Sequence, residues 1–299
     1  MIEKTKLLTL ILLLTTCFVF GQDSTSLFSR LNGISNSGID FFNVDGIEIT
    51  VQKVETELNP KNISKKFKNL SVKEKEITSS DSTLEFPNYY VSKSKVATEQ
   101  LTMNMNYYFF KNAEDKVVGI SFITINKTDK ELERKFARLI KDNAIPKEVY
   151  SSLNIDDINF AGRKIPLGSG CRWMGINNVQ CPYWGQLNWS VHKTLEDATS
   201  SVNNQFMSIK AGNKGKIVSD TTVAVVFEGA ETNAKKIIFD ITGVNSVLVG
   251  MSGGKTLTVY FIAAPVRNNF VSCVMSFWNN DQINPSGLPP LLEQVMKLK

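Results

Sequence analysis

The chain has 299 residues, of which 42% are hydrophobic and 21% are charged, and its formal net charge is +5. These values are typical of a globular protein and argue against extensive disorder, a collagen-like repeat or a multi-span membrane protein. The excess of Lys and Arg is small and spread along the chain rather than gathered in one stripe, so we expect no nucleic-acid partner.

The first residues have the pattern of a secretory signal peptide. Two lysines precede an apolar run, Leu7–Phe20, which is too short to cross a bilayer and is followed by small and polar residues. We expect cleavage after Gly21, so that residues 1–21 are removed and the mature chain begins at Gln22. No later stretch is apolar for long enough to span a membrane, so we expect no transmembrane span in the mature chain.

A lipid anchor is the alternative interpretation of this segment. Cys17 follows Leu14-Thr15-Thr16, which partly matches a bacterial lipobox, although Thr stands where Gly, Ala or Ser is usual. The apolar run also continues beyond the cysteine. We therefore expect an exported protein of the bacterial envelope, in the periplasm or outside the cell, and keep lipid attachment through Cys17 as the alternative.

The remaining cysteines would mature in an oxidising compartment, where a disulfide can persist. Cys171 and Cys181 flank a turn-like segment centred on Ile176, and folding the chain about that residue brings them to facing strand positions. We predict a disulfide that clamps this hairpin and contributes about 2–3 kcal/mol to stability. Two unpaired buried thiols are the alternative. Cys273 alternates with apolar neighbours and is predicted to be a core residue.

The sequence gives no pattern for a metal or a cofactor. The spacing between Cys171 and Cys181 is not that of a zinc site, and the chain has a single histidine, His192. Gly250–Thr256 superficially resembles a phosphate-binding loop, but Val249 stands where the motif needs glycine, and a strand rather than a helix follows. We expect no metal ion and no bound cofactor.

A secreted hydrolase is the alternative function. Ser169 or Cys171 would be its nucleophile and His192 its base, because a catalytic Ser or Cys needs a base within hydrogen-bond reach. His192 directly precedes a capped helix, so a surface or capping position is the preferred interpretation of this residue. A disulfide at Cys171 would remove that nucleophile. We therefore assign no catalytic residue and expect that the protein is not an enzyme.

Alternating apolar residues predict strands, and apolar residues three or four apart predict helices. In the first half we expect a strand over 44–58, a helix from Asn59-Pro60, a loop or weak strands over 71–95, a hairpin of 101–110 and 117–125, and a helix capped at Thr128. In the second half we expect strands within 176–189, a helix from Thr194 to Gly212, short strands at 223–227, 237–241 and 247–249, a hairpin of 257–263 and 270–278, and a closing helix at Pro289-Pro290.

Both halves therefore show a similar order of elements. We predict an α+β fold of two tandem units, residues 22–150 and 151–299, each an antiparallel sheet with helices packed on one face. This order of elements is similar to that of the Mog1/PsbP-like folds, and the resemblance rests on element order alone, with no motif residue. It implies a binding or assembly module rather than an enzyme.

An aromatic cluster surrounds the predicted disulfide and consists of Trp173, Tyr183, Trp184 and Trp189. Because Trp and Tyr anchor interfaces, these residues are the candidate surface for a ligand, a glycan or a partner protein. The alternative is that they stack within the core of the second unit.

A cluster of lysines on the first helix, Lys61, Lys65, Lys66 and Lys68, allows weak contact with an anionic surface, but an ordinary solvated helix face is the preferred interpretation. Overall, the sequence predicts an exported, soluble, non-enzymatic binding protein whose partner and oligomeric state it does not identify.

Overall fold

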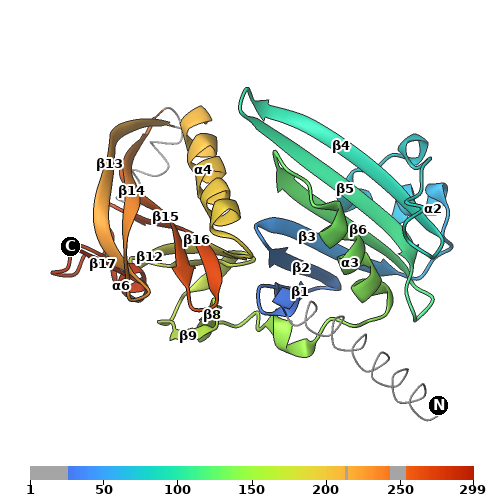
Figure 1. Ribbon diagram of the computed structural model, residues 1–299, viewed down its shortest axis with the longest axis horizontal. Coiled ribbons are helices and arrows are strands. Elements are labelled where there is room, and N and C mark those ends of the chain that lie inside the picture. The colour runs from blue at the N-terminus through green and yellow to red at the C-terminus, as the bar shows by residue number, and fades with distance from the viewer. Residues whose placement is uncertain (1–25, 213–214, 243–253) are drawn as a thin grey trace, which may run out of the picture.

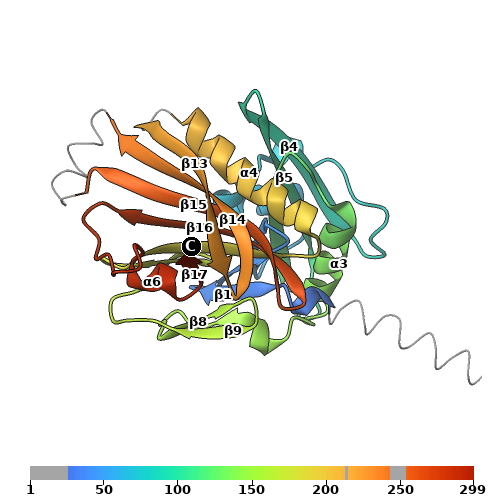
Figure 2. The same cartoon turned by 60° about the vertical axis from the view of Figure 1, so that its left-hand side comes forward.

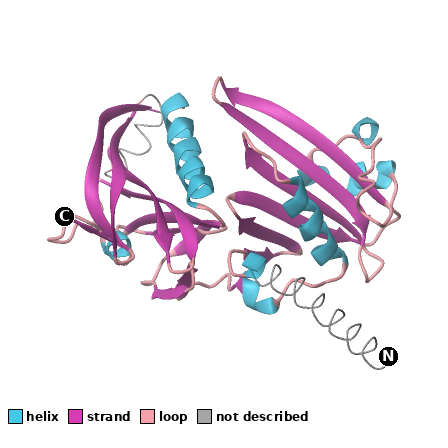
Figure 3. Ribbon diagram, in the orientation of Figure 1, coloured by secondary structure: helices cyan, strands magenta, loops and turns pink. Residues whose placement is uncertain are grey.

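The computed structural model describes residues 26–212, 215–242 and 254–299. Within these ranges the chain forms a seven-stranded sheet, an eight-stranded sheet and a two-stranded sheet (Figures 1 and 3). In the same ranges, none of the helices has both the length and the apolar character that crossing a membrane requires. The expected signal peptide with Cys17, the expected strand at 247–249 and most of the Gly250–Thr256 loop lie outside the described residues.

The first sheet has the order β4-β5-β6-β3-β2-β1-β7. Neighbouring strands are antiparallel except for β1 and β7, which are parallel. Its strands are β1 (Asn32–Asn36), β2 (Ile39–Val44), β3 (Ile47–Val54), β4 (Asn88–Thr98), β5 (Leu101–Lys111), β6 (Val117–Ile125) and β7 (Tyr150–Ser151).

Helical segments lie on both faces of the first sheet, and the cover on the second face is partial. Helix α3 (Lys130–Lys141) packs on one face, where Phe136 meets Phe42 and Phe122 edge to face. Helix α2 (Pro60–Lys66) and the short 3-10 turns η1 (Lys68–Leu70) and η2 (Glu74–Glu76) cover the other face. Parts of β5 and β6 are therefore buried on both faces, whereas β3 is buried on one face and partly exposed on the other.

The second sheet has the order β10-β11-β12-β16-β15-β14-β13-β17, and all its neighbouring strands are antiparallel. Its strands are β10 (Arg172–Gly175), β11 (Asn178–Cys181), β12 (Gly185–His192), β13 (Gly215–Phe227), β14 (Ala230–Ile241), β15 (Thr256–Val266), β16 (Asn269–Trp278) and β17 (Met296–Leu298).

Helix α4 (Leu195–Ala211) lies along one face of this second sheet, as Figure 2 shows. The other face packs against a core to which the two-stranded sheet β8 (Asp157–Phe160) and β9 (Arg163–Pro166) and the short helix α6 (Pro290–Glu293) contribute. The strands β12, β15 and β16 are therefore covered on both faces over much of their length, whereas β13 is largely exposed.

The two sheets share an arrangement of strands. In the first, β1-β2-β3 form a meander, a helix follows, and β4-β5-β6 form a second meander whose last strand pairs with β3. In the second, β10-β11-β12 and β14-β15-β16 are joined in the same way, with β16 on β12. Beyond β14 this sheet continues with β13 and ends with the edge strand β17.

The predicted α+β class, with helices packed on one face of each sheet, is wrong. The protein is mostly β, with two large antiparallel sheets and few helices. The physical reason is that exposed strands lack the apolar alternation that predicts them: β4 and the first part of β13 carry mostly exposed or half-buried side chains, yet they add long strands to the two sheets. The resemblance to Mog1/PsbP-like folds rested on the same expectation and is withdrawn with it.

Of the alternatives for the polar stretch over 71–95, a loop or weak strands, its last part forms a strand: β4 is an eleven-residue edge strand with mostly exposed or half-buried side chains and little apolar alternation. Two other predicted elements need correction. The closing helix is limited to α6, because the chain then pairs with β13 as β17. Helix α3 is capped by Asp129 and not by Thr128. The Asp129 carboxylate accepts a hydrogen bond from the backbone N–H of Leu132.

The turn between β2 and β3 contacts the end of β12. The backbone N–H of Asp45 donates to the carbonyl of Val191 at 3.1 Å, and the Asp45 carboxylate accepts from the backbone N–H of Lys193 at 3.0 Å. The same carboxylate forms an ion pair with Arg30 at 2.8 Å. The division into units at residues 150 and 151 stays a prediction.

Candidate functional site

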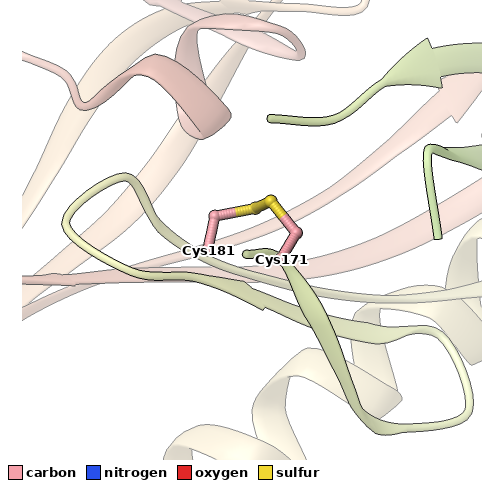
Figure 4. Close-up of a disulfide and its surroundings, with 2 residues drawn as sticks. All are labelled: Cys171 and Cys181. Atoms are coloured by element: carbon pink, nitrogen blue, oxygen red, sulfur yellow. A yellow bond between two sulfur atoms is a disulfide. The ribbon is translucent and has the colours of Figure 1, made fainter. Parts of the chain in front are cut away.

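The disulfide prediction is confirmed. Cys171 and Cys181 are bonded, with their Cα atoms 4.1 Å apart (Figure 4). In the adjacent hairpin Arg172 of β10 lies opposite Gln180 of β11, so the disulfide closes the open end of this pair of strands. The third cysteine, Cys273, is buried in the core, as predicted, and burial raises the pKa of its thiol.

Directly after the disulfide, Tyr183 and Trp184 form what we call the aromatic loop. The backbone N–H of Trp184 donates to the carbonyl of Cys181 at 3.0 Å. From another part of the chain, Gln282 donates to the Tyr183 carbonyl at 2.8 Å and Leu291 donates to the Trp184 carbonyl at 3.2 Å. The backbone of the aromatic loop is therefore held by hydrogen bonds from several segments as well as by the disulfide.

The backbone of Tyr183 adopts a left-handed conformation, with φ at 63°. Non-glycine residues are uncommon in this region, and such strain persists only where the surrounding structure imposes it. The Trp184 ring lies against Gly168, where an added Cβ would be 2.2 Å from the ring. The glycine therefore allows the indole to pack closely at this point.

The four residues of the aromatic cluster differ in exposure and fall into two pairs. Tyr183 is 64% exposed and Trp184 is 37% exposed, whereas Trp189 is buried. Trp173 is half-buried; its ring centroid lies 6.3 Å from that of Trp189, and its indole N–H donates to the carbonyl of Ser152 at 3.0 Å. Two rings are thus presented to solvent, and two belong to the packing of the second sheet.

His192 is buried rather than exposed, so the expected surface position is wrong. Its Nε2 lies 2.9 Å from the hydroxyl of Ser272, and its Nδ1 has no hydrogen-bond partner among the described residues. Burial lowers the pKa of this imidazole to about 4. Gly46 lies against the ring, and an added Cβ there would be 3.0 Å from His192 Cε1. The turn that covers His192 lies almost 150 residues earlier in the sequence.

The structure does not bring the proposed hydrolase residues together. The sulfur of Cys171 is bonded to Cys181, which lies opposite Gly185 at the start of β12. His192 ends that strand seven residues later, a distance of about 23 Å along an extended chain. Ser169 is two residues from Cys171 and so belongs to the disulfide end. The hypothesis of a hydrolase that uses Ser169 or Cys171 with His192 is therefore wrong.

Sequence reasoning missed a buried polar cluster under α3. The carboxylate of Glu133 accepts hydrogen bonds from the Asn106 amide at 2.7 Å, the Tyr108 hydroxyl at 3.0 Å and the Lys130 ammonium at 2.9 Å. Burial, followed by the charge of Glu133, raises the pKa of Tyr108. Glu133 lies on the apolar stripe of its helix with Ala137 and Ile140.

The position of Glu133 on the apolar stripe of α3 was the sequence signal for a buried carboxylate. Because the Glu133 carboxylate is satisfied from three directions, we interpret the cluster as a structural one.

The lysines of the first helix and its continuation are exposed: Lys61, Lys65, Lys66 and Lys68. Ile63 and Phe67 point into the core on the opposite side. A contact between these lysines and an anionic surface stays a proposal. Among the residues that the structure describes, no group of three or more His, Cys, Asp and Glu side chains is placed to hold a metal ion.

No family model and no curated protein matches this chain. Among solved structures, the chain is weakly similar to the di-domain ARO/CYC StfQ from the steffimycin biosynthetic pathway, at 10% identity and a TM-score of 0.16, over 89% of this chain and 77% of that one. It is also weakly similar to DynU16, a putative protein in the dynemicin biosynthetic locus, at 8% identity and a TM-score of 0.17, over 84% and 76% of the two chains. At these scores neither structure informs the fold or the function.

Proposed function

We propose that the protein is exported to an oxidising compartment, where it acts as a binding protein rather than an enzyme, with the aromatic loop as its recognition surface. The disulfide supports the location, because such bonds persist outside the reducing cytosol. The pattern of residues 1–21 supports the same location. The burial of His192 away from Ser169 and Cys171 argues against the catalytic alternative.

One observation carries the choice of surface: two exposed aromatic rings stand on a backbone that several segments hold in place. Tyr and Trp provide much of the binding free energy at protein interfaces, because they bury a large area with few rotatable bonds. A loop that is already ordered loses little entropy on binding, so more of the contact energy appears as affinity.

Site-specific photo-cross-linking tests this proposal. A photoreactive phenylalanine analogue replaces Tyr183 in the full chain, produced in its host, and a second strain carries the same analogue at Val218, an exposed apolar position of the same sheet that is 51% exposed. We expect a discrete adduct from position 183 and none from position 218, because only the aromatic loop would contact the bound molecule.

Trp184→Ala in the first strain should weaken this adduct, provided that its folding is unchanged by circular dichroism. No adduct at position 183, or the same adducts from both positions, would contradict the proposed surface.

A further inference from the structure

A second candidate binding site lies on the first sheet, beside the start of β4. It is a depression with a volume of about 470 Å³, within the range of small-molecule sites. Its lining includes Leu58, Ser79, Ser80, Ser82, Phe86 and Tyr89. None of these residues belongs to the aromatic loop, so this inference stands apart from the proposed function.

The loop that forms the depression is held in shape by its own hydrogen bonds. The backbone N–H of Asp81 donates to the side-chain oxygen of Asn88 at 2.9 Å, and the Asn88 amide donates back to the Asp81 carbonyl at 3.0 Å. The same amide also donates to the carbonyl of Phe86 at 2.9 Å. Where the loop meets β4, the N–H of Tyr90 donates to the carbonyl of Ser79 at 2.8 Å. The depression is therefore preformed.

The charge at the depression is already neutralised. Asp81 is its one ionisable carboxylate, and this group pairs with Arg134 at 2.8 Å and accepts a hydrogen bond from the backbone of Thr83 at 3.0 Å. The Asp81 side chain is 8% exposed. No Lys, Arg or His is among the lining residues. A charged ligand would find no opposite charge there, so the lining favours a neutral one.

The lining combines aromatic rings with hydroxyl groups. Phe86 and Tyr89 are half-buried, and the Phe86 ring is fixed edge to face against Phe110 at 5.1 Å. Ser80 and Ser82 are exposed, and their hydroxyls make no side-chain hydrogen bond within the described part of the chain. The same holds for the hydroxyl of Tyr89. These hydroxyls can both donate and accept.

We propose that this depression binds a neutral mono- or disaccharide. A pyranose ring has an apolar face of C–H groups, which the Tyr89 ring would cover, and a rim of hydroxyls, which the serine hydroxyls would meet. A purely apolar ligand would lack partners for the serines, and an anion would lack a cation.

Ligand-observed NMR with the folded, disulfide-bonded protein tests this inference. The probes are glucose, maltose, cellobiose and N,N′-diacetylchitobiose, and glucuronate is the charged counterpart of glucose. We expect saturation transfer to at least one neutral sugar and weaker transfer to glucuronate than to glucose.

Matched variants locate the site. Ser80→Trp fills the depression, and Ser92→Trp places the same side chain on an exposed position of β4 outside it. We expect Ser80→Trp to weaken the affinity for the sugar by about tenfold or more, equivalent to about 1.4 kcal/mol, and Ser92→Trp to leave it unchanged. Tyr89→Ala, once its folding is checked by circular dichroism, should weaken affinity as well.

Binding of none of the four neutral sugars would overturn the inference, as would tighter binding of glucuronate than of glucose. Equal affinities in Ser80→Trp and Ser92→Trp would also overturn it, because the sugar would then bind elsewhere.

Discussion

Glu133→Ala is expected to lower the free energy of unfolding by about 3–5 kcal/mol, the largest effect that we predict for a single substitution outside the hydrophobic core. The substitution would leave the Lys130 ammonium, the Tyr108 hydroxyl and the Asn106 amide without their shared acceptor. The amide and the hydroxyl are buried, so water cannot replace the lost carboxylate without opening the packing between α3 and the sheet. Urea denaturation at neutral pH measures the change.

Glu131→Ala is the matched control for this prediction. Glu131 stands in the same first turn of α3 and carries the same charge, but its side chain is exposed. Both variants lose one favourable interaction with the helix dipole. The difference between their free energies of unfolding therefore gives the contribution of the buried cluster alone. We expect Glu131→Ala to cost no more than about 0.5–1 kcal/mol. Equal losses in the two variants would mean that the Glu133 cluster contributes nothing beyond the dipole term.

Acid is expected to destabilise the protein through its single histidine, before most carboxylates titrate. The pKa of His192 is about 4 in the folded protein and about 6.5 in the unfolded chain, so the unfolded chain binds a proton first. Stability from this group is complete above pH 6.5 and falls as the pH drops towards 4. The expected total loss is about 3 kcal/mol, with about 2 kcal/mol of it above pH 5.

The surroundings of His192 explain this direction. Burial disfavours the imidazolium, and the charge of Arg30 adds to the effect, whereas Asp45 and Asp197 oppose it. Carboxylates such as Asp81 and Asp197 have lowered pKa values, so their stabilising contributions are lost at more acidic pH. The decline between pH 6.5 and 5 therefore belongs mainly to His192.

Two measurements check the acid effect. The chain has one histidine, so its ring C–H signals in NMR are unambiguous, and their titration midpoint should lie near pH 4. His192→Gln keeps a hydrogen-bonding group for Ser272 without a titrating imidazole, so urea denaturation of this variant should show a much smaller loss of stability over the same pH range. A midpoint near 6.5, or equal pH dependence in both proteins, would contradict the buried position of His192.

Local patterns predicted a good part of the secondary structure. The alternation from Leu101 to Phe109 predicted β5, and Thr194 caps α4 as its position before an apolar stripe indicated. The cysteine spacing around Ile176 predicted the disulfide. These features depend on residues close together in the sequence, which is why a single sequence is sufficient to find them.

Features that depend on distant residues were missed or misassigned. His192 is buried by the turn at Gly46, and no pattern near residue 192 indicates that contact. The partial cover on the second face of the first sheet was missed, although the continuous run Tyr107–Phe110 was a signal for it. The aromatic cluster could not be divided from sequence, because Trp184 and Trp189 differ in burial only through the path of the chain between the disulfide and β12.

The proposed maturation and the proposed surface are linked. The disulfide ends at Cys181, and the carbonyl of that residue accepts the hydrogen bond from Trp184 that shapes the aromatic loop. A chain that stayed in a reducing compartment would lose one of the constraints on this loop. Export, oxidation and the presentation of Tyr183 and Trp184 therefore form a single proposal.

The most direct test is the intact mass of the protein, purified without reductant from the envelope fraction or the medium of its host and treated with a thiol alkylating reagent under denaturing conditions. We predict a chain that begins at Gln22, is two hydrogens lighter than its fully reduced form, and is alkylated at Cys273 alone. A chain that keeps Met1 and is alkylated at Cys171 and Cys181 would contradict the proposal.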